Sequence, residues 1–306
     1  MKKSEAPIFP QETIGKWLDE IDVLDETRRA YCGGMRAFER FLREKGVDPH
    51  DLGESDVIEF KRSLETRLAP DSVSSYLIGV RSFYRWIDSP VTPDIAAHVK
   101  GVRRVRGFKK DILTPAQASR LLDETRGSSL VEARNHAILN LMLRTGVRSI
   151  EVVRANKGDI RTKAGCPVLY VHGKGRRDKD EFVVLTEEAL GPIDRYLAMR
   201  PSSSDDDPLF ASTSNRNKGG RLTTRTVSGI AKNAMRAIGI DDMRHTAHSL
   251  RHTAVTYALL GGAALEEAQT MARHADISTT MVYSHHIDRI GNAAERKIGQ
   301  VLDARR

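Results

Sequence analysis

Apolar residues recur every three or four positions through most of residues 1–100, which is the spacing of helices that bury one face. The clearest segment, DETRRAYCGGMRAFERFLREKG, predicts a helix with Asp25 as its N-cap and Gly46 at its end. The segment PDSVSSYLIGVRSFYRWID repeats the pattern, and further helices are expected near 11–21 and 55–67. The region therefore predicts a small four-helix bundle. Its buried stripes are predicted to be Tyr31, Met35, Phe38 and Leu42, and Val73, Leu77, Val80, Tyr84 and Ile87.

Both of these predicted helices carry arginines away from the apolar stripe. Such a face suits contact with DNA phosphates, because arginine can track the backbone without reading its sequence. Arginine is also common on ordinary helix surfaces, so a solvated face is an equally good interpretation. The candidate DNA-contacting residues here are Arg29, Arg36, Arg40, Arg43, Arg81 and Arg85.

The remainder of the chain mixes helices with a short sheet. Thr114 and Pro115 predict the start of a helix, and an apolar helix through NHAILNLML is predicted to end at Gly146. The segment CPVLYVHGKGRRDKDEFVVL predicts two antiparallel strands joined by a basic turn, and RHTAHSLRHTAVTYALL predicts another helix. The fold class expected is mainly α with a small antiparallel β-sheet.

Charge divides the chain unevenly. Residues 1–100 hold 15 basic and 18 acidic side chains, whereas the remaining residues hold 34 and 23, which together give the net charge of +8. This excess favours a polyanionic partner, either nucleic acid or an acidic membrane surface. Residues 101–112 have neither helical nor strand periodicity and are predicted to be an interdomain linker. Its basic residues, which either contact phosphates or form an ordinary solvated run, are Arg103, Arg104, Arg106, Lys109 and Lys110.

Two cysteines are too few for a disulfide framework or a cysteine-based metal cluster, which fits a reducing cytosol. The opening residues lack the apolar run of a signal peptide, and AILNLML is too short to span a bilayer. The expectation is a soluble cytoplasmic protein without a membrane partner.

Several polar pairs carry candidate chemistry. Arg148 and Glu151 lie three residues apart in a predicted helix, as do His248 and Arg251, so each pair shares one face. His248 and His252 lie four apart, a spacing that could hold a metal, but the glutamate of the HExxH zinc-hydrolase motif is missing. A zinc hydrolase is therefore a remote alternative.

The stretch MARHADISTTMVYSH places a tyrosine nine positions after a histidine. In one continuous helix Tyr283 would point about 180° away from His274. Asp276 and Ser278 could instead cap a second helix, and such a break permits the two side chains to converge.

Six residues in order, in the contexts TGVRSIEV, GKG, HSLRH and RHADISTTMVYSH, resemble the active site of the tyrosine recombinase (phage integrase) family. The resemblance spans nearly the whole chain. It implies a helical, SAM-like core-binding domain over residues 1–100, the linker 101–112, and an α+β catalytic domain over residues 113–306. The six matching positions are Arg148, Lys174, His248, Arg251, His274 and Tyr283.

The resemblance also implies a role for each residue. Tyr283 would attack a DNA phosphodiester, with His248 as its base, and leave a 3′-phosphotyrosine without metal, ATP or other cofactor. Two arginines, Arg148 and Arg251, would neutralise the phosphate, since guanidinium groups bind phosphate oxygens in pairs. His274 would hydrogen-bond a phosphate oxygen, Lys174 would protonate the departing 5′ oxygen, and Glu151 would support the site.

The implied partners are double-stranded DNA with inverted-repeat core sites and further copies of the chain, which would form a tetramer on DNA. The C-terminal segment is predicted to carry an apolar face formed by Ile287, Ile290, Ala294, Ile298, Val301 and Leu302. This face could dock on the chain's own catalytic domain, whereas the family resemblance implies that it docks on a neighbouring protomer. Two features depart from the family pattern. Arg273 replaces a usual glycine, which could alter local packing or add a phosphate contact. The tail lacks the ending of the housekeeping Xer recombinases, which favours integration or excision of a mobile element.

Three other functions stay open on the sequence. An Xer-type enzyme would resolve chromosome or plasmid dimers. A type IB topoisomerase would use similar chemistry on one strand, although the two-domain layout favours recombination. A DNA-binding protein derived from a decayed integrase would ordinarily have lost at least one of the six residues.

Overall fold

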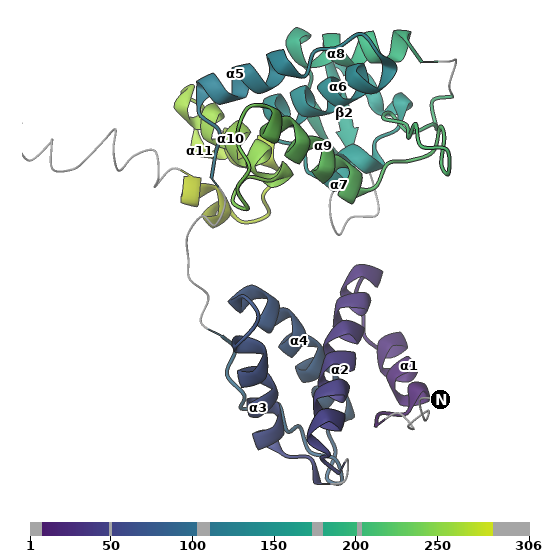
Figure 1. The fold of residues 1–306 in the computed structure, drawn as a ribbon, viewed down its shortest axis with the longest axis vertical. Helices are drawn as coiled ribbons and strands as arrows, with labels where there is room; N and C mark the ends of the chain where they lie inside the picture. The colour runs from purple at the N-terminus through teal and green to yellow at the C-terminus, as the bar shows by residue number, and fades with distance from the viewer. Residues whose placement is uncertain (1–7, 49–50, 103–110, 173–179, 201–203, 284–306) are drawn as a thin grey trace, which may run out of the picture. The chain divides into compact units, whose positions relative to one another are not determined.

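The computed structural model describes residues 8–48, 51–102, 111–172, 180–200 and 204–283. The chain forms two compact units, Met1–Arg106 and Gly107–Arg306 (Figure 1). Lys174, the basic linker residues from Arg103 to Lys110, and the predicted docking face beyond residue 286 lie outside the described residues. None of the helices in the described part of the chain is both long and apolar enough to cross a membrane.

The N-terminal unit is a bundle of four helices, as the periodicity predicts. Large aromatic side chains fill its centre, among them Trp17, Phe38, Phe60 and Phe83, each at most 2% exposed. The helices are α1 (Gln11–Glu20), α2 (Asp25–Lys45), α3 (Glu54–Glu65) and α4 (Pro70–Ile87).

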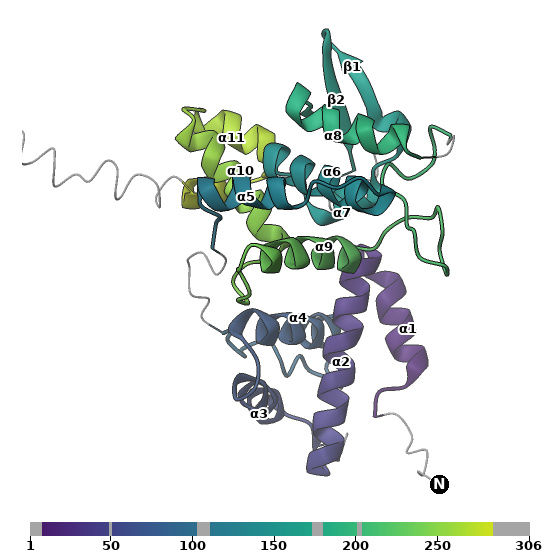
Figure 2. The same cartoon turned by 45° about the horizontal axis from the view of Figure 1, so that its top comes forward.

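Helices α2 and α4 lie side by side, and two glycines let their backbones meet (Figures 1 and 2). A Cβ atom added at Gly34 would lie 2.4 Å from the Tyr76 carbonyl oxygen, and one at Gly79 would lie 2.6 Å from the Tyr31 carbonyl oxygen. Both obstacles are helix backbone, which cannot move aside as a side chain can. The two helices therefore reach this separation only with glycine at both positions.

The arginine face predicted from the sequence is largely exposed. Arg81 is only partly exposed. The exposed members are Arg29, Arg36, Arg40, Arg43 and Arg85.

The predicted cap of α2 is wrong by one residue. Leu24 occupies the N-cap position and Asp25 is the first helical residue, where its carboxylate still favours the positive end of the helix. Gly46 does end the helix, in the left-handed conformation (φ 68°) that glycine adopts readily.

The C-terminal unit consists of helices that pack on one another and one small sheet. Its helices are α5 (Pro115–Glu124), α6 (Leu130–Thr145), α7 (Ser149–Arg154), α8 (Glu187–Ala198), α9 (Thr224–Ala237), α10 (Ala247–Leu260) and α11 (Leu265–Ala272), with a 3₁₀ turn at Lys157–Asp159. Residues 277–283 are also helical. Thr114 caps α5 by accepting a hydrogen bond from the Gln117 amide at 3.2 Å, as predicted.

The sheet has three antiparallel strands in the order β1-β2-β3, where the sequence predicts two. The predicted pair is β2 (Cys166–Val171) and β3 (Glu181–Val184), with Val168 opposite Val184. The additional strand β1 (Ile160–Lys163) lies beside β2 in Figure 2, with Ile160 opposite Leu169. Its residues after Ile160 are exposed, so it lacks the alternation of apolar and polar residues that reveals a strand.

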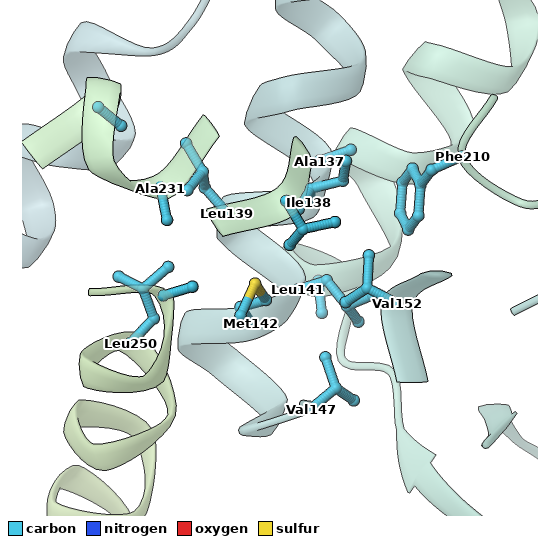
Figure 3. Close-up of a cluster of buried hydrophobic side chains, with 14 of the residues drawn as sticks. Ala137, Ile138, Leu139, Leu141, Met142, Val147, Val152, Phe210, Ala231 and Leu250 are labelled. Carbon is cyan, nitrogen blue, oxygen red and sulfur yellow. The ribbon is translucent and has the colours of Figure 1, made fainter. Parts of the chain in front are cut away.

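Helix α6 runs through the core and fixes the elements that carry the candidate chemistry. It packs against α5, α8, α9 and α10, and its side chains point to several sides at once (Figure 3). At its end Gly146 adopts φ 63°, which turns the chain directly into α7. The labelled core residues are Ala137, Ile138, Leu139, Leu141, Met142, Val147, Val152, Phe210, Ala231 and Leu250.

The close approach of α2 and α4 predicts opposite effects for two neighbouring glycines. Gly34→Ala should lower the free energy of unfolding of the N-terminal unit by about 1–3 kcal/mol, because the added methyl group forces the helices apart. Gly33→Ala is the matched control: nothing lies within 4 Å of its added Cβ. It should stabilise α2 by about 1 kcal/mol, the difference in helix propensity.

Urea unfolding followed by tryptophan fluorescence measures this unit alone, because both tryptophans of the chain, Trp17 and Trp86, lie in it. Equal changes in the free energy of unfolding for Gly34→Ala and Gly33→Ala would contradict the close contact between the backbones of α2 and α4.

Candidate active site

Five of the six predicted catalytic side chains line one cavity of about 300 Å³ in the C-terminal unit. They come from the start of α7, from α10, and from the segment after α11. Lys174, the sixth, lies outside the described residues. The cavity is lined by Arg148, His248, Arg251, His252, His274, Thr279, Val282 and Tyr283.

Arg251 is the most buried charged group of the cavity, at 1% exposure. Its guanidinium donates one hydrogen bond to the carbonyl of Gly146, where α6 ends, and another to the carbonyl of Ala272, where α11 ends. Helix C-termini carry partial negative charge, which stabilises a cation placed there. Burial, and then the nearby charges of Arg148 and Arg273, lower the pKa of Arg251 to about 9. Positive charge is therefore concentrated here, and an anion would stabilise it.

Arg148 stands at the N-cap of α7 and is paired with Glu151, as the three-residue spacing predicts. Its backbone amide donates to Glu151 Oε2 at 2.7 Å, and its Nη1 donates to Oε1 at 2.8 Å. The Arg148 side chain remains 26% exposed, whereas that of Glu151 is fully buried. Burial would raise the pKa of Glu151, but Arg273 and Arg148 together hold it below its usual value. Glu151 therefore stays ionised and orients Arg148.

Arg273 also belongs to this charge cluster. Its Nη2 donates to Glu151 Oε2 at 2.7 Å, and its carbonyl oxygen accepts a hydrogen bond from Arg148 Nη2 at 3.1 Å. The sequence marks Arg273 as a departure from a glycine and leaves open whether its side chain alters local packing or contacts a phosphate. The partner of its side chain lies 122 positions away in the chain, which no local pattern reveals.

The predicted break between His274 and Tyr283 is present. Asp276 Oδ1 accepts a hydrogen bond from the Ser278 amide at 2.8 Å and so caps the helical residues 277–283. The rings of His274 and Tyr283 are stacked, with centroids 6.1 Å apart and planes inclined by 20°. His274 Nδ1 is 2.8 Å from Thr280 Oγ1. Burial, and then the charges of Arg251 and Arg148, lower the pKa of His274 to about 4, so its ring is neutral at pH 7.

The Tyr283 hydroxyl forms a hydrogen bond with Nδ1 of His252. Tyr283 is only 3% exposed, and burial raises its pKa to about 12, although Arg251 and Arg148 act in the opposite direction. The hydroxyl is therefore protonated at pH 7 and needs a proton acceptor before it can act as a nucleophile.

His252 is a residue of the site that the sequence suggests only as a metal ligand. Its ring meets that of His248 edge-on, with centroids 4.4 Å apart. Burial, and then electrostatic repulsion from His248 and Arg251, lowers the pKa of His252 to about 3. One signal in the sequence places His252 at the site: it directly follows Arg251 and lies four residues after His248. Within the described residues no group of three or more histidines, cysteines or carboxylates could hold a metal ion.

A second and larger cavity, of about 1060 Å³, shares Arg148 and His274 with the first. It lies between β3 and α11. Apolar side chains of Phe182, Val184 and Met271 line it together with the carboxylates of Glu181, Glu266 and Glu267.

Comparisons with known proteins assign both units of the chain. The model of the phage integrase family matches residues 111–289, and that of the phage integrase N-terminal SAM-like domain matches residues 22–89. The chain is 29% identical over 296 residues to tyrosine recombinase XerD of Pseudomonas putida, which covers 93% of this chain and 94% of that protein. It is 30% identical to XerD of Caulobacter vibrioides over 85% of each chain.

Solved structures resemble the fold at lower identity. The XerH site-specific recombinase bound to a palindromic difH substrate, in a post-cleavage complex, aligns with a TM-score of 0.72 at 18% identity, covering 95% of this chain and 91% of that one. The Tn1549 transposon integrase in complex with transposon right-end DNA aligns with a TM-score of 0.67 at 16% identity, covering 91% and 94%.

Proposed function

Because the chain belongs to the phage integrase family and is a tyrosine-type site-specific DNA recombinase, we propose that Tyr283 is the nucleophile that cleaves the DNA backbone. One observation carries the proposal. The Tyr283 hydroxyl lies in a cavity with two guanidinium groups, Arg148 and Arg251, and two neutral histidines. A phosphodiester seated there would meet a nucleophile and the positive charge that its transition state requires.

In the proposed reaction the Tyr283 oxygen attacks phosphorus, and the bond from phosphorus to the 5′ oxygen breaks. A 3′-phosphotyrosine forms, and it retains the energy needed for rejoining with a second 5′ hydroxyl. Arg148 and Arg251 neutralise the non-bridging oxygens, and His274 donates a hydrogen bond to one of them. The protein's own charges supply this stabilisation, so the scheme includes neither a metal nor ATP.

The hydroxyl proton of Tyr283 passes to the pair of histidines. A base works best when its pKa lies near the working pH, and the low pKa of His252 makes it a poor base. We therefore assign His252 to holding the hydroxyl and His248, which lines the same cavity, to accepting the proton. The departing 5′ oxygen takes a proton from Lys174, a role that rests on the GKG context of that residue.

We further propose that the protein acts on double-stranded DNA in the cytoplasm, at inverted-repeat core sites, as a tetramer. Two solved structures with a similar fold, one bound to a difH substrate and one to transposon right-end DNA, support DNA as the partner of this protein. Candidate phosphate contacts come from α2, from α4 and from the basic linker. They are the exposed Arg29, Arg36, Arg40 and Arg43 of α2, and the exposed Arg85 and half-buried Arg81 of α4.

Assembly is proposed to use the larger cavity as the acceptor of a neighbouring protomer's C-terminal segment. The cavity is lined by apolar side chains, among them Phe182, Val184 and Met271, and by the carboxylates of Glu181, Glu266 and Glu267. The terminal segment has an apolar stripe and basic residues, among them Arg289, Arg296 and Lys297. The two surfaces are thus complementary in both polarity and charge.

The biological role proposed is integration or excision of a mobile element, with resolution of chromosome or plasmid dimers as the alternative. The C-terminal sequence supports the role in a mobile element. Similarity to XerD over nearly the full length supports the resolution of dimers. Direct repeats that border the gene and recombine in the presence of the protein would establish the first role. Recombination confined to a single chromosomal site elsewhere would establish the second.

Tyr283→Phe should leave binding to the cognate site intact and abolish the covalent protein–DNA adduct, because only the nucleophilic oxygen is lost. A suicide substrate, in which the cleaved end diffuses away, traps the adduct for a denaturing gel. Persistence of the adduct in the variant would refute the assignment of Tyr283.

Lys174→Ala should slow cleavage by roughly 10²–10⁴-fold and weaken binding much less, if general acid catalysis is lost. A substrate with a 5′-bridging sulfur has a better leaving group and needs no acid, so it should recover most of the rate. If the variant cleaves the sulfur substrate as slowly as the ordinary one, Lys174 is not the acid.

Truncation after His286 should preserve binding to a single site and eliminate synapsis and strand exchange. Native gels with one-site and two-site DNA separate these steps. Glu266→Lys combined with Glu267→Lys should weaken synapsis in the same assay, because it places positive charge opposite a basic segment. A truncated protein that recombines normally would exclude the proposed docking.

A further inference from the structure

Arg273 adopts a backbone conformation that ordinary side chains avoid. It follows the last residue of α11 with φ 53° and ψ 50°, in the left-handed region. Glycine enters this region without a clash between Cβ and the backbone, so a long side chain at this turn requires compensating contacts.

The side chain of Arg273 makes those contacts inside the protein. It is only 3% exposed. Its Nη2 donates to Glu151 Oε2 at 2.7 Å, its Nε lies 3.4 Å from Glu151 Oε1, and its Nη1 donates to the Met271 carbonyl at 2.6 Å. Glu181 Oε2 lies 3.9 Å from the same Nε. The guanidinium is thus committed to two carboxylates and to its own helix end, and a phosphate in the cavity would not reach it.

Glu151 consequently has two cationic partners. Its Oε1 accepts from Arg148 Nη1 at 2.8 Å, while its Oε2 accepts from the Arg148 amide and from Arg273. Without Arg273, the carboxylate would neutralise Arg148 alone. With Arg273 present, the three arginines Arg148, Arg251 and Arg273 face two carboxylates, the buried Glu151 and the partly exposed Glu181, so an excess of positive charge remains at the cavity.

The backbone of Arg273 also fixes the direction of Arg148. The carbonyl oxygen of Arg273 accepts from Arg148 Nη2 at 3.1 Å, so the Arg148 guanidinium is held between this carbonyl and Glu151. Its side chain nevertheless stays partly exposed and lines the cavity.

Building on the proposed function, we propose that Arg273 is a positioning residue for phosphodiester cleavage. It neutralises Glu151, so that Glu151 can orient Arg148 without cancelling the positive charge that Arg148 presents to the scissile phosphate. Arg273 acts through Arg148 and does not itself touch the DNA.

A charge cycle tests this proposal. Arg273→Gly suits the left-handed turn and removes the guanidinium, leaving Glu151 to neutralise Arg148. Glu151→Gln retains an oxygen that accepts from Arg148 but carries no charge. If the role of Arg273 is to offset Glu151, the double variant should cleave faster than Arg273→Gly, although it has lost one more native contact.

The measurement is the single-turnover rate of adduct formation on a suicide substrate at saturating protein, alongside the Kd for the same DNA and the thermal midpoint. Arg273→Gly should slow cleavage roughly 10–100-fold with a change in Kd of about threefold or less. Glu151→Gln together with Arg273→Gly should recover at least about tenfold of that loss.

Two results would overturn the proposal: cleavage by Arg273→Gly at the wild-type rate, or slow cleavage that the double variant fails to recover. The second would assign Arg273 to a purely structural contact between α11 and α7. Failure of the proposed function itself is distinguishable, because the wild-type protein would then form no adduct that depends on Tyr283.

Discussion

The candidate site depends on one buried guanidinium that is held by helix ends. Arg251 bonds to the carbonyls that end α6 and α11, so the position of each helix determines where the guanidinium points. Helix α6 in turn is fixed by the core around it (Figure 3). A buried charge is costly unless it is paired, and the pairing here is with dipoles of the backbone. Among the ion pairs of the described residues none includes Arg251, so its charge remains available to a bound anion.

The same positive charge explains the state of the other groups. Arg251 and Arg148 contribute to keeping His274 neutral, and they offset part of the burial that raises the pKa of Tyr283. A phosphodiester would bring a negative charge into this cavity. It would ease proton uptake by the neighbouring histidines, because their protonation would no longer add to an unbalanced positive charge. Binding of the substrate would thereby prepare the proton transfer that the proposed nucleophile, Tyr283, requires.

Local patterns in the sequence predicted the helices and their chief breaks. Gly46 and Gly146 end helices in left-handed turns, and Asp276 caps the helical turns that bring Tyr283 back to His274. The strand β1 escaped prediction because it is short and exposed, and its pairing with β2 depends on a partner strand rather than on its own residues.

The contacts that complete the site escaped prediction for a related reason. His252 meets Tyr283 across 31 positions and Arg273 meets Glu151 across 122. The packing of α7, α10 and α11 brings such partners together. Neither periodicity nor spacing along the chain predicts this packing. The resemblance to a family identified the residues common to its members. Arg273, which differs from the family pattern, could be interpreted only from the structure.

Mass spectrometry that locates the covalent bond to DNA tests the role of Tyr283 most directly. Adduct trapped on a suicide substrate is digested with nuclease and trypsin, and the peptide covering residues 274–289 is fragmented. This peptide contains Ser278, Thr279, Thr280, Tyr283 and Ser284 as possible acceptors. We expect a nucleotide joined through its 3′ phosphate to Tyr283 alone. A nucleotide on another residue, or attachment through a 5′ phosphate, would contradict it.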